Sequence, residues 1–390
     1  MPVSDHDALA DAKPVSDPLD TAGRRVVLVH DWLTGMRGGE KVLESLCRLL
    51  PDSDLITLVH VRGSVSPLIE ARRVRTSFVQ HLPSPARLYR HYLPLFPTAI
   101  ETFDLDDADL VVSTSHCAAK AVVATGRAPH VCYCHSPMRY AWDQFDSYFG
   151  PERLGRLGSA AARPVLAWLA RWDRATAGRV SQFVANSRFV AGRIGRYYNR
   201  DASVLYPPVD TRFFTPGDSQ QRPYFLVVSA LVPYKRLDVA IRAATRLGVH
   251  LKVVGTGPDL DRLREQADGR TSFLGSVDAA ELRDLYRGAL GLVLPAEEDF
   301  GIAPVEAMAC GRPVIALGRG GATETVVPGV TGVLVESPDD DAFATAMDQV
   351  QHTTYDPAVL TRHASRFSVA QFEHGLRATL THALAGTSPC

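Results

Sequence analysis

The chain has 390 residues, which corresponds to two or three domains of ordinary size. With 46% hydrophobic and 22% charged residues it has a globular composition, which excludes a disordered or fibrous protein. The net charge of −1 conceals an asymmetry, because residues 24–200 carry 24 Lys and Arg against 15 Asp and Glu, whereas residues 201–390 carry 17 against 23.

The first 23 residues are polar and acidic and contain no apolar core segment, so we expect a disordered tail and not a signal peptide. The chain then alternates short β-branched runs with helical patterns, beginning with a strand at Val26–Val29, a glycine-containing turn and a helix over Lys41–Leu50. Further strands are expected at Leu55–Val59, Leu110–Ser113, His130–Cys134 and Phe183–Ala185. Such continuous apolar runs are typical of parallel strands that are buried on both faces.

A proline-containing polar segment over residues 206–223 predicts a linker. The alternation then restarts, with strands expected at Phe225–Ser229, Leu251–Val254, Ser272–Leu274, Leu290–Leu294, Val314–Ala316 and Gly332–Val335. The fold class is therefore α/β, with doubly wound Rossmann-like domains at 24–205 and 224–365 and a C-terminal helix within 366–390 that we expect to return to the N-terminal domain. Ligands bind such folds at the carboxyl ends of the strands, so we expect the active site in a cleft between the domains.

No apolar run approaches the ~18 residues of a membrane-spanning helix. The six cysteines form no C-x-x-C pair and none lies at zinc-ligand spacing from histidine. We therefore expect a cytosolic, reduced protein without a structural metal.

The first turn between a strand and a helix is rich in glycine, with Gly35, Gly38 and Gly39 in a G-x-x-G-G pattern. Here backbone amides can approach an anionic or hydroxyl-rich ligand at a helix N-terminus, although a merely tight turn is the alternative. The spacing is not the dinucleotide pattern G-x-G-x-x-G, which argues against a nicotinamide or flavin enzyme.

The most informative segment covers residues 294–311. A strand ends, three acidic residues form a loop, and a helix begins at about Ile302, so Glu298 lies at the strand end and Glu306 two turns along the helix. Two carboxylates placed in this way can accept hydrogen bonds from the hydroxyls of a sugar or ribose. The alternative, a solvated acidic loop, does not explain an isolated glutamate in an otherwise apolar helix.

With these residues the chain resembles the family 4 retaining glycosyltransferases of the GT-B fold, whose Glu-x7-Glu motif matches Glu298 to Glu306. Other matching segments are Asn186–Arg188, Tyr206–Asp210, Leu231–Arg236 and Gly320–Glu324. The resemblance implies that the C-terminal domain binds a sugar nucleotide and the N-terminal domain binds the acceptor.

The resemblance also implies roles for single residues. Glu298 would lie near the donor sugar as a catalytic residue, Glu306 would bind ribose hydroxyls, and Lys235 would stabilise the donor phosphates. The other implied donor-binding positions are Gly38, Gly39, Arg236, Phe300, Gly301, Ile302, Gly320 and Gly321. The chain departs from the family at Ala230, which stands in place of the phosphate-binding arginine.

Two histidines that follow neighbouring strands are catalytic candidates. His116 lies where the family often carries an active-site histidine, and His135 follows the next strand. Each could contact substrate or hydrogen-bond a neighbouring loop, and we favour His116. Asp31 and Asp143 are weaker candidates that could be helix caps, and His30 is expected to be structural or to line the site.

The resemblance implies transfer of a hexose from a nucleoside-diphosphate sugar to a hydroxyl acceptor by front-face attack, without a metal or another cofactor. Residues 30–44, 134–143 and 229–236 resemble the mannosyltransferase-like branch of surface polysaccharide or glycolipid synthesis. This favours GDP-mannose as donor and a glycan or lipid-linked acceptor. The alternatives are a UDP-hexose-dependent glycosyltransferase, a non-catalytic sugar-nucleotide-binding subunit and an epimerase. Asp106–Asp107 and Asp339–Asp341 resemble metal-binding runs but are expected to form a loop and a helix start.

Residues 150–200 hold ten arginines against two acidic residues, and residues 70–92 hold five arginines against Glu70, interleaved with aromatic and leucine side chains. This pattern suits the interface of an anionic membrane, with solvated helix faces as the alternative. We expect a cytoplasmic protein that attaches peripherally to the inner face of the cell membrane, and we expect no nucleic-acid partner.

Overall fold

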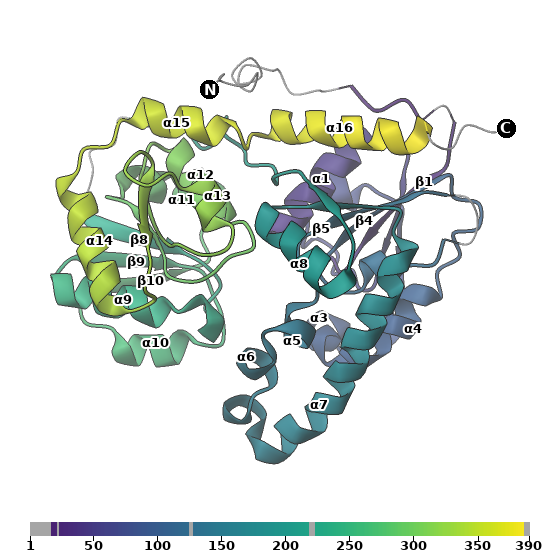
Figure 1. The fold of residues 1–390 in the computed structure, drawn as a ribbon, viewed down its shortest axis with the longest axis horizontal. Helices are drawn as coiled ribbons and strands as arrows, with labels where there is room; N and C mark the ends of the chain where they lie inside the picture. The colour runs from purple at the N-terminus through teal and green to yellow at the C-terminus, as the bar shows by residue number, and fades with distance from the viewer. Residues whose placement is uncertain (1–16, 22, 125–127, 218–222, 386–390) are drawn as a thin grey trace. The chain divides into compact units, whose positions relative to one another are not determined.

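The computed structural model describes residues 17–385 except 22, 125–127 and 218–222. These residues form two compact α/β units, which confirms the expected fold class (Figure 1). The N-terminal unit comprises residues 17–208 together with 372–385, and the C-terminal unit comprises residues 209–371.

The N-terminal unit contains a parallel seven-stranded sheet in the order β3-β2-β1-β4-β5-β6-β7. Its strands are β1 (Val26–His30), β2 (Asp54–Thr57), β3 (Val74–Thr76), β4 (Leu110–Ser115), β5 (His130–Cys134), β6 (Gln182–Ala185) and β7 (Ala202–Val204). Every residue of β1, β4 and β5 is buried, as the continuous apolar runs predict. The strands β3 and β7 were not expected, because each has three residues and a polar one at its centre.

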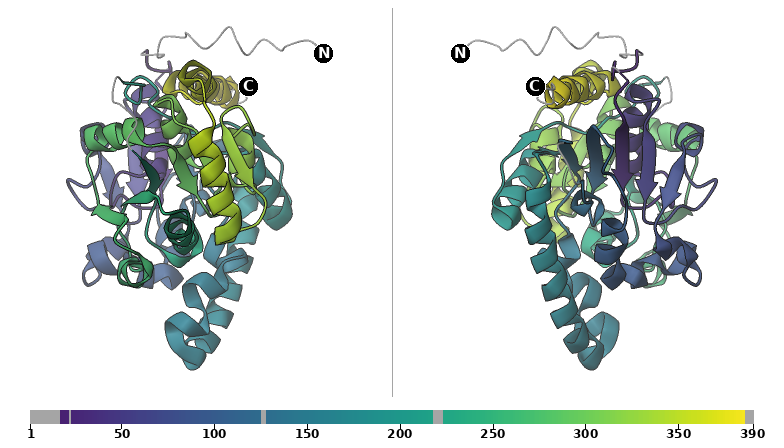
Figure 2. Two further views of the ribbon diagram at one scale, coloured as in Figure 1. Left: turned by 90° about the vertical axis from the view of Figure 1, so that its left-hand side faces the viewer. Right: turned by 90° about the vertical axis from the view of Figure 1, so that its right-hand side faces the viewer.

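Helices cover both faces of this sheet: α1 (Gly38–Leu49), α2 (Pro67–Glu70), α3 (Pro85–Leu88), α4 (Phe96–Glu101), α5 (Arg139–Trp142), α6 (Phe145–Phe149), α7 (Pro151–Thr176), α8 (Arg188–Tyr198) and α16 (Val369–Ala385). The helix α7 extends well beyond the sheet (Figure 2). Its base is fixed by a buried ion pair in which Lys120 Nζ lies 2.9 Å from Asp173 Oδ1. Because the Tyr198 hydroxyl also donates to Asp173, this ion pair joins α7 to α8 as well.

The C-terminal unit contains a parallel six-stranded sheet in the order β10-β9-β8-β11-β12-β13. Its strands are β8 (Tyr224–Val228), β9 (His250–Val254), β10 (Thr271–Gly275), β11 (Leu292–Leu294), β12 (Val314–Leu317) and β13 (Gly332–Val335). Its helices are α9 (Leu237–Leu247), α10 (Leu260–Gln266), α11 (Ala279–Gly288), α12 (Ile302–Ala309), α13 (Ala322–Thr325), α14 (Asp340–His352) and α15 (Pro357–Ser365). The core packs α9 and α14 against the central strands, with Ile241, Ile315 and Phe343 fully buried.

The structure corrects two expected boundaries. Leu19 is buried, and its N–H donates to the carbonyl of Leu49 (2.7 Å), so this part of the expected tail packs against α1. Residues 1–16 and 22 of that tail lie outside the described residues. Val209 is buried and donates to the carbonyl of Phe367 (2.9 Å), so the expected linker belongs to the C-terminal unit from residue 209 to 217. Residues 218–222 of the linker are outside the description.

In the described part of the chain, five cysteines are buried, at positions 47, 117, 132, 134 and 310. Burial raises the pKa of Cys47 to about 11, and the pKa values of Cys132 and Cys310 to about 12. No described helix combines the length and the apolar character that are needed to cross a membrane.

Candidate functional site

Two loops of the C-terminal unit, which follow β11 and β12, lie against each other. Glu298 and Gly320 form an isolated parallel bridge, and the N–H of Gly321 donates to the carbonyl of Glu298 (2.8 Å). A Cβ atom on Gly320 would lie 2.3 Å from the carbonyl oxygen of Glu298, and one on Gly321 would lie 2.3 Å from the Cα atom of Phe300. Glycine is therefore required at both positions for this close backbone approach.

Lys235 forms an ion pair with Glu298, and both side chains are largely buried. Arg236, the N-cap of α9, has a φ of 51°, a left-handed conformation that costs a non-glycine residue roughly 1–2 kcal/mol. Its guanidinium lies 3.5 Å from Asp238 and remains nearly half exposed. Ala230 is exposed, and the cationic residues on the segments that form this site include Lys235, Arg236 and Arg319, which directly precedes Gly320.

The helix α12 begins after Gly301, whose φ of 89° favours glycine. Glu306 is buried on this helix and accepts a hydrogen bond from the hydroxyl of Tyr286 (2.9 Å). The side chain of Phe300 is buried against Phe367, so a ligand at this loop can meet only its backbone. Ile302 is the first residue of α12, as expected.

In the N-terminal unit, Asp31 organises the loop after β4. Its fully buried carboxylate accepts hydrogen bonds from four consecutive backbone N–H groups, those of residues 116–119, at 2.6–2.9 Å. The Nδ1 atom of His116 also lies 3.1 Å from Asp31 Oδ2. Asp31 therefore fixes the backbone of this loop and orients His116, but it is not the N-cap of the helix that follows it, since the N-cap of α1 is Arg37. In the sequence, this role is indicated by a carboxylate that directly follows the first strand.

The pKa values of the two candidate histidines are shifted in opposite directions. Burial would raise the pKa of Asp31, but His116 and the backbone N–H groups outweigh it and hold that pKa below its ordinary value. Burial would lower the pKa of His116, but the charge of Asp31 outweighs it and raises that pKa. Burial, together with His116, lowers the pKa of His135 to about 3. Divergent pKa values in neighbouring groups are typical of sites that use one group charged and the other neutral.

These histidines meet at the N-terminus of α1, which begins with Gly38 and Gly39. The rings of His116 and His135 are 6.3 Å apart, and a Cβ atom on Gly39 would lie 3.5 Å from the Nε2 atom of His135. This Nε2 is buried and has no hydrogen-bond partner among the described residues. His30 is structural, as expected, because its Nδ1 pairs with the hydroxyl of Thr114. The four site residues predicted in the N-terminal unit, Gly38, Gly39, His116 and His135, therefore lie close together.

Several acidic residues fall outside both clusters. Asp143 ends α5 as its C-cap residue, forms an ion pair with Arg193 and accepts a hydrogen bond from the hydroxyl of Tyr197 (3.3 Å). Asp339 caps α14 through the N–H of Ala342 (2.9 Å), which confirms the expected helix start. Within the described residues, no group of three or more His, Cys, Asp or Glu side chains is arranged to hold a metal ion. Sequence reasoning missed Tyr286, because its contact with Glu306 is a tertiary one that no local pattern indicates.

Two family models match the chain. Residues 36–213 match the model described as Glycosyltransferase Family 4, and residues 209–366 match the model described as Glycosyl transferases group 1. Together they cover the chain from α1 to α15.

Among curated proteins, the D-inositol 3-phosphate glycosyltransferase of Mycolicibacterium smegmatis is 32% identical over 233 residues, 52% of this chain and 53% of that protein. That of Mycolicibacterium gilvum is 33% identical over 230 residues, 51% of each chain. The chain spans about half the length of the curated relatives it matches.

Solved structures resemble nearly the whole fold. Anabaena Alr3699/HepE in complex with UDP has a TM-score of 0.68 at 21% identity, covering 92% of this chain and 100% of that one. Sucrose-phosphate synthase from Thermosynechococcus elongatus has a TM-score of 0.70 at 19% identity, covering 94% and 100%. Three observations support the same conclusion: the two Rossmann-like parallel-sheet units, the two adjoining family models, and the spacing of Glu298 and Glu306. The chain belongs to the family 4 glycosyltransferases of the GT-B fold.

Proposed function

We propose that the protein is a retaining glycosyltransferase that moves a hexose from a nucleoside-diphosphate sugar to a hydroxyl acceptor. The observation that carries this proposal is the pair of carboxylates in the C-terminal unit, Glu298 in an ion pair with Lys235 and Glu306 hydrogen-bonded by the hydroxyl of Tyr286. Related structures support the kind of donor, because those of Anabaena Alr3699/HepE are described as complexes with UDP, with UDP and glucose, and with UDP-glucose.

The main chemical requirement is to stabilise the leaving diphosphate as its charge develops. In the proposed reaction Lys235 and Arg236 supply positive charge, and backbone N–H groups at the start of α12 and near Gly320–Gly321 supply hydrogen bonds. The leaving phosphate accepts the acceptor's proton in front-face attack. This route assigns Glu298 to positioning the donor sugar and requires no carboxylate nucleophile.

In the N-terminal unit, His116 and His135 take different parts in this proposal. His116, held by Asp31 and about a third exposed, donates a hydrogen bond through its outer ring nitrogen. His135, which stays neutral, offers its buried Nε2 atom to a hydroxyl. Gly38 and Gly39 begin α1, and because Gly39 has no side chain, the space beside the Nε2 atom of His135 is left for the ligand.

For the donor we propose GDP-mannose, which the resemblance to the mannosyltransferase-like branch supports, and for the acceptor a surface glycan or glycolipid precursor. The described complexes of Anabaena Alr3699/HepE favour a UDP-hexose as the second candidate. The deciding experiment incubates the protein with a panel of radiolabelled sugar nucleotides and a glycan or glycolipid extract, and then analyses the products. Labelled product from GDP-mannose supports the first donor, product from a UDP-hexose supports the second, and donor binding without product indicates a non-catalytic subunit.

We propose that the reaction needs no divalent cation, because cationic side chains and backbone N–H groups are available to neutralise the diphosphate. Activity should therefore be the same in buffer with EDTA and with added magnesium. Activity that EDTA abolishes and that magnesium or manganese restores would contradict this account of the leaving group.

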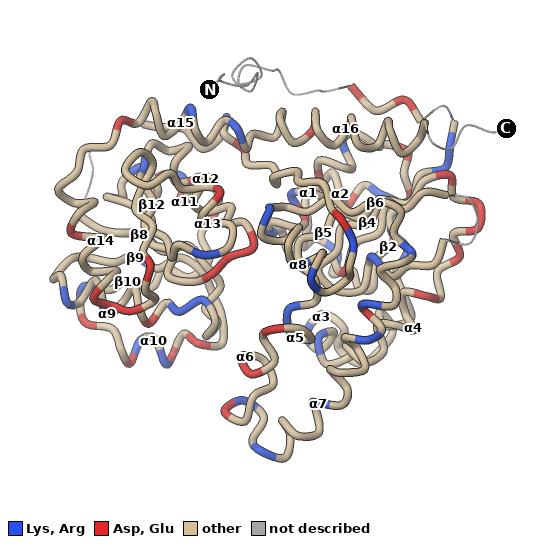
Figure 3. The backbone as a smooth tube through the Cα atoms, in the orientation of Figure 1, with Lys and Arg blue, Asp and Glu red and all other residues tan. Residues whose placement is uncertain are grey.

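We also propose peripheral attachment to an anionic membrane through α7, which would bring the enzyme to a lipid-linked acceptor. Leu157 on this helix is 89% exposed, and exposed arginines at 153 and 156 flank it. Basic positions lie along the same extension in Figure 3. Asp173 does not offset this charge, because it is buried with Lys120. Apolar side chains flanked by cations suit a lipid interface.

The second basic segment, residues 70–92, should contribute less to membrane attachment than its five arginines suggest. Arg72 donates to the carbonyl groups of Cys47 and Pro51 at the end of α1, so its role is structural. Sedimentation with phosphatidylglycerol vesicles at low salt tests the attachment, using Leu157→Ser and Arg156→Ser against Arg73→Ser. Equal sedimentation of all variants, or none for the wild type, would remove α7 from this role.

A further inference from the structure

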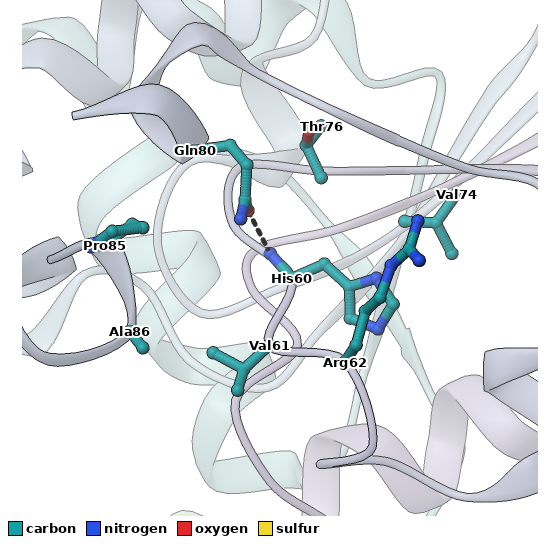
Figure 4. Close-up of a pocket in the computed structure, with 8 residues that line it drawn as sticks. All are labelled: His60, Val61, Arg62, Val74, Thr76, Gln80, Pro85 and Ala86. Atoms are coloured by element: carbon teal, nitrogen blue, oxygen red, sulfur yellow. Dashed lines mark hydrogen bonds between the residues drawn. The ribbon is translucent and has the colours of Figure 1, made fainter. Parts of the chain in front are cut away.

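We propose that the N-terminal unit contains a second ligand site, a pocket that binds the phosphate or carboxylate group of an anionic acceptor. This inference rests on the proposed transfer function, since it assigns the chemistry of the acceptor. The pocket has a volume of about 440 Å³, and its lining includes His60, Arg62, Thr76 and Gln80 (Figure 4). Ligand pockets in proteins range from about 300 to 1,000 Å³. The space is therefore sufficient for a sugar phosphate or a headgroup of similar size.

The pocket lies at the same edge of the sheet as the histidine cluster. His60 follows β2, and Thr76 ends β3, so both are at the carboxyl ends of neighbouring parallel strands. Beyond the sheet, Leu33 pairs with His60 in a parallel bridge, and the N–H of Val61 donates to the carbonyl of Leu33 (2.8 Å). The pocket wall is therefore hydrogen-bonded directly to the loop between β1 and α1.

That loop also reaches the candidate catalytic residues. Trp32, next to Leu33, packs edge-on against the ring of His116 at 4.4 Å between centroids. The loop continues to Gly38 and Gly39 at the start of α1. A backbone connection of this kind fixes the position of the pocket relative to His116. A ligand that occupies the pocket through one group can then present a hydroxyl toward the histidines.

The polar groups that line the pocket are predominantly donors. The backbone N–H of His60 donates to the side-chain oxygen of Gln80 (2.8 Å), which leaves the Gln80 amide nitrogen as a donor (Figure 4). Arg62 is exposed and has no ion-pair partner among the described residues. A guanidinium presents a planar pair of donors that matches phosphate and carboxylate oxygens.

No Asp or Glu side chain lines the pocket in the described residues. Both carboxylate oxygens of the nearby Glu70 already have partners. One accepts a hydrogen bond from the N–H of Gly63 (2.7 Å), and the other lies 3.2 Å from the Nε2 atom of His60. Val61 and Val74 provide an apolar wall beside these donors. The combination suits a ligand with an oxyanion at one end and a carbon framework at the other.

The test is an NMR titration of the full chain with inorganic phosphate and with glucose 6-phosphate, following the side-chain amide signal of Gln80, which lines the pocket and is kept in every variant. The matched variants are Arg62→Gln and Arg73→Gln, which make the same change of charge, and Arg73 is exposed and does not line the pocket. We expect saturable binding of the sugar phosphate that weakens at least tenfold in Arg62→Gln and is unchanged in Arg73→Gln. Equal weakening in both variants, or none in either, would overturn the site.

The two probes distinguish the source of the anion. Tighter binding of glucose 6-phosphate than of inorganic phosphate supports an anionic acceptor, whereas equal or tighter binding of inorganic phosphate shows a free-anion site and overturns the acceptor assignment. Calorimetric affinity for GDP and UDP is measured on the same samples. If the wild type binds glucose 6-phosphate but neither GDP nor UDP, the proposed function is refuted. If it binds GDP or UDP but not glucose 6-phosphate, only the pocket is refuted.

Discussion

Replacing Asp31 with asparagine tests whether one buried carboxylate holds the loop after β4, which carries the candidate residue His116. Asp31 accepts four backbone N–H groups at 2.6–2.9 Å. Asparagine keeps one acceptor oxygen and turns an NH₂ group toward the remaining donors, so about two hydrogen bonds are lost. At roughly 1.5–3 kcal/mol for each bond to a charged group, the free energy of unfolding of the N-terminal unit should fall by about 3–6 kcal/mol.

The assay is urea denaturation followed by tryptophan fluorescence. All four tryptophans lie within residues 32–172, so the signal reports the N-terminal unit. The control is Asp54→Asn, which removes a partly exposed partner of Arg25 and should cost about 0–1 kcal/mol. A loss below about 1 kcal/mol in Asp31→Asn, or one equal to the control, would refute the reasoning.

The pH dependence gives the same substitution a second readout. Because the folded pKa of Asp31 is lowered, its contribution is present above about pH 4 and is lost as the pH falls. Because the folded pKa of His116 is raised, the part due to their ion pair is complete below about pH 6.5 and is lost as the pH rises through that pKa. The difference between wild type and variant should therefore be largest between about pH 4 and 6.5. An NMR titration in which the pKa of His116 does not fall in Asp31→Asn would contradict the pairing.

Three further substitutions test the C-terminal unit. Tyr286→Phe should weaken nucleotide binding about ten- to a hundredfold by calorimetry, as expected for the loss of one hydrogen bond to a charged group, whereas Tyr355→Phe should not, because the Tyr355 hydroxyl has no hydrogen-bond partner among the described residues. Gly321→Ala should push apart the loops that follow β11 and β12 and abolish nucleotide binding, because the added Cβ atom would lie 2.3 Å from the Cα atom of Phe300. Gly269→Ala, with open space around its Cβ position, should leave binding unchanged. Arg236→Gly should be more stable than Arg236→Ala by about 1 kcal/mol in thermal denaturation, since only glycine relieves the left-handed backbone. Equal stability of the two Arg236 variants would show that this residue is not strained.

The periodic parts of the fold were predictable from the sequence. The strand at His130–Cys134 and the start of α12 at Ile302 were predicted at their observed positions, because buried parallel strands and an apolar helix leave continuous local patterns. The edge strands β3 and β7 were missed because a half-exposed strand of three residues carries no such pattern.

The candidate site was predictable in its residues and not in its contacts. Glu298 and Glu306 stand out because acidic side chains interrupt an apolar segment. The contact of Glu306 with Tyr286 joins α12 to α11, and that of Asp31 with His116 joins residues 85 positions apart, which follow β1 and β4. Such contacts depend on sheet order, which local sequence patterns do not encode.

The buried cysteines bear on spectroscopic labelling of the enzyme. Maleimides and iodoacetamides react with the thiolate, which is scarce at pH 7 for thiols that are buried and have a pKa of about 11 or 12. The described cysteines should therefore remain unmodified while the protein is folded. With Cys390 replaced by serine, a single cysteine introduced at Leu157 becomes a selective attachment point for a polarity-sensitive dye. A blue shift of its emission on addition of vesicles would then show whether the end of α7 enters the lipid.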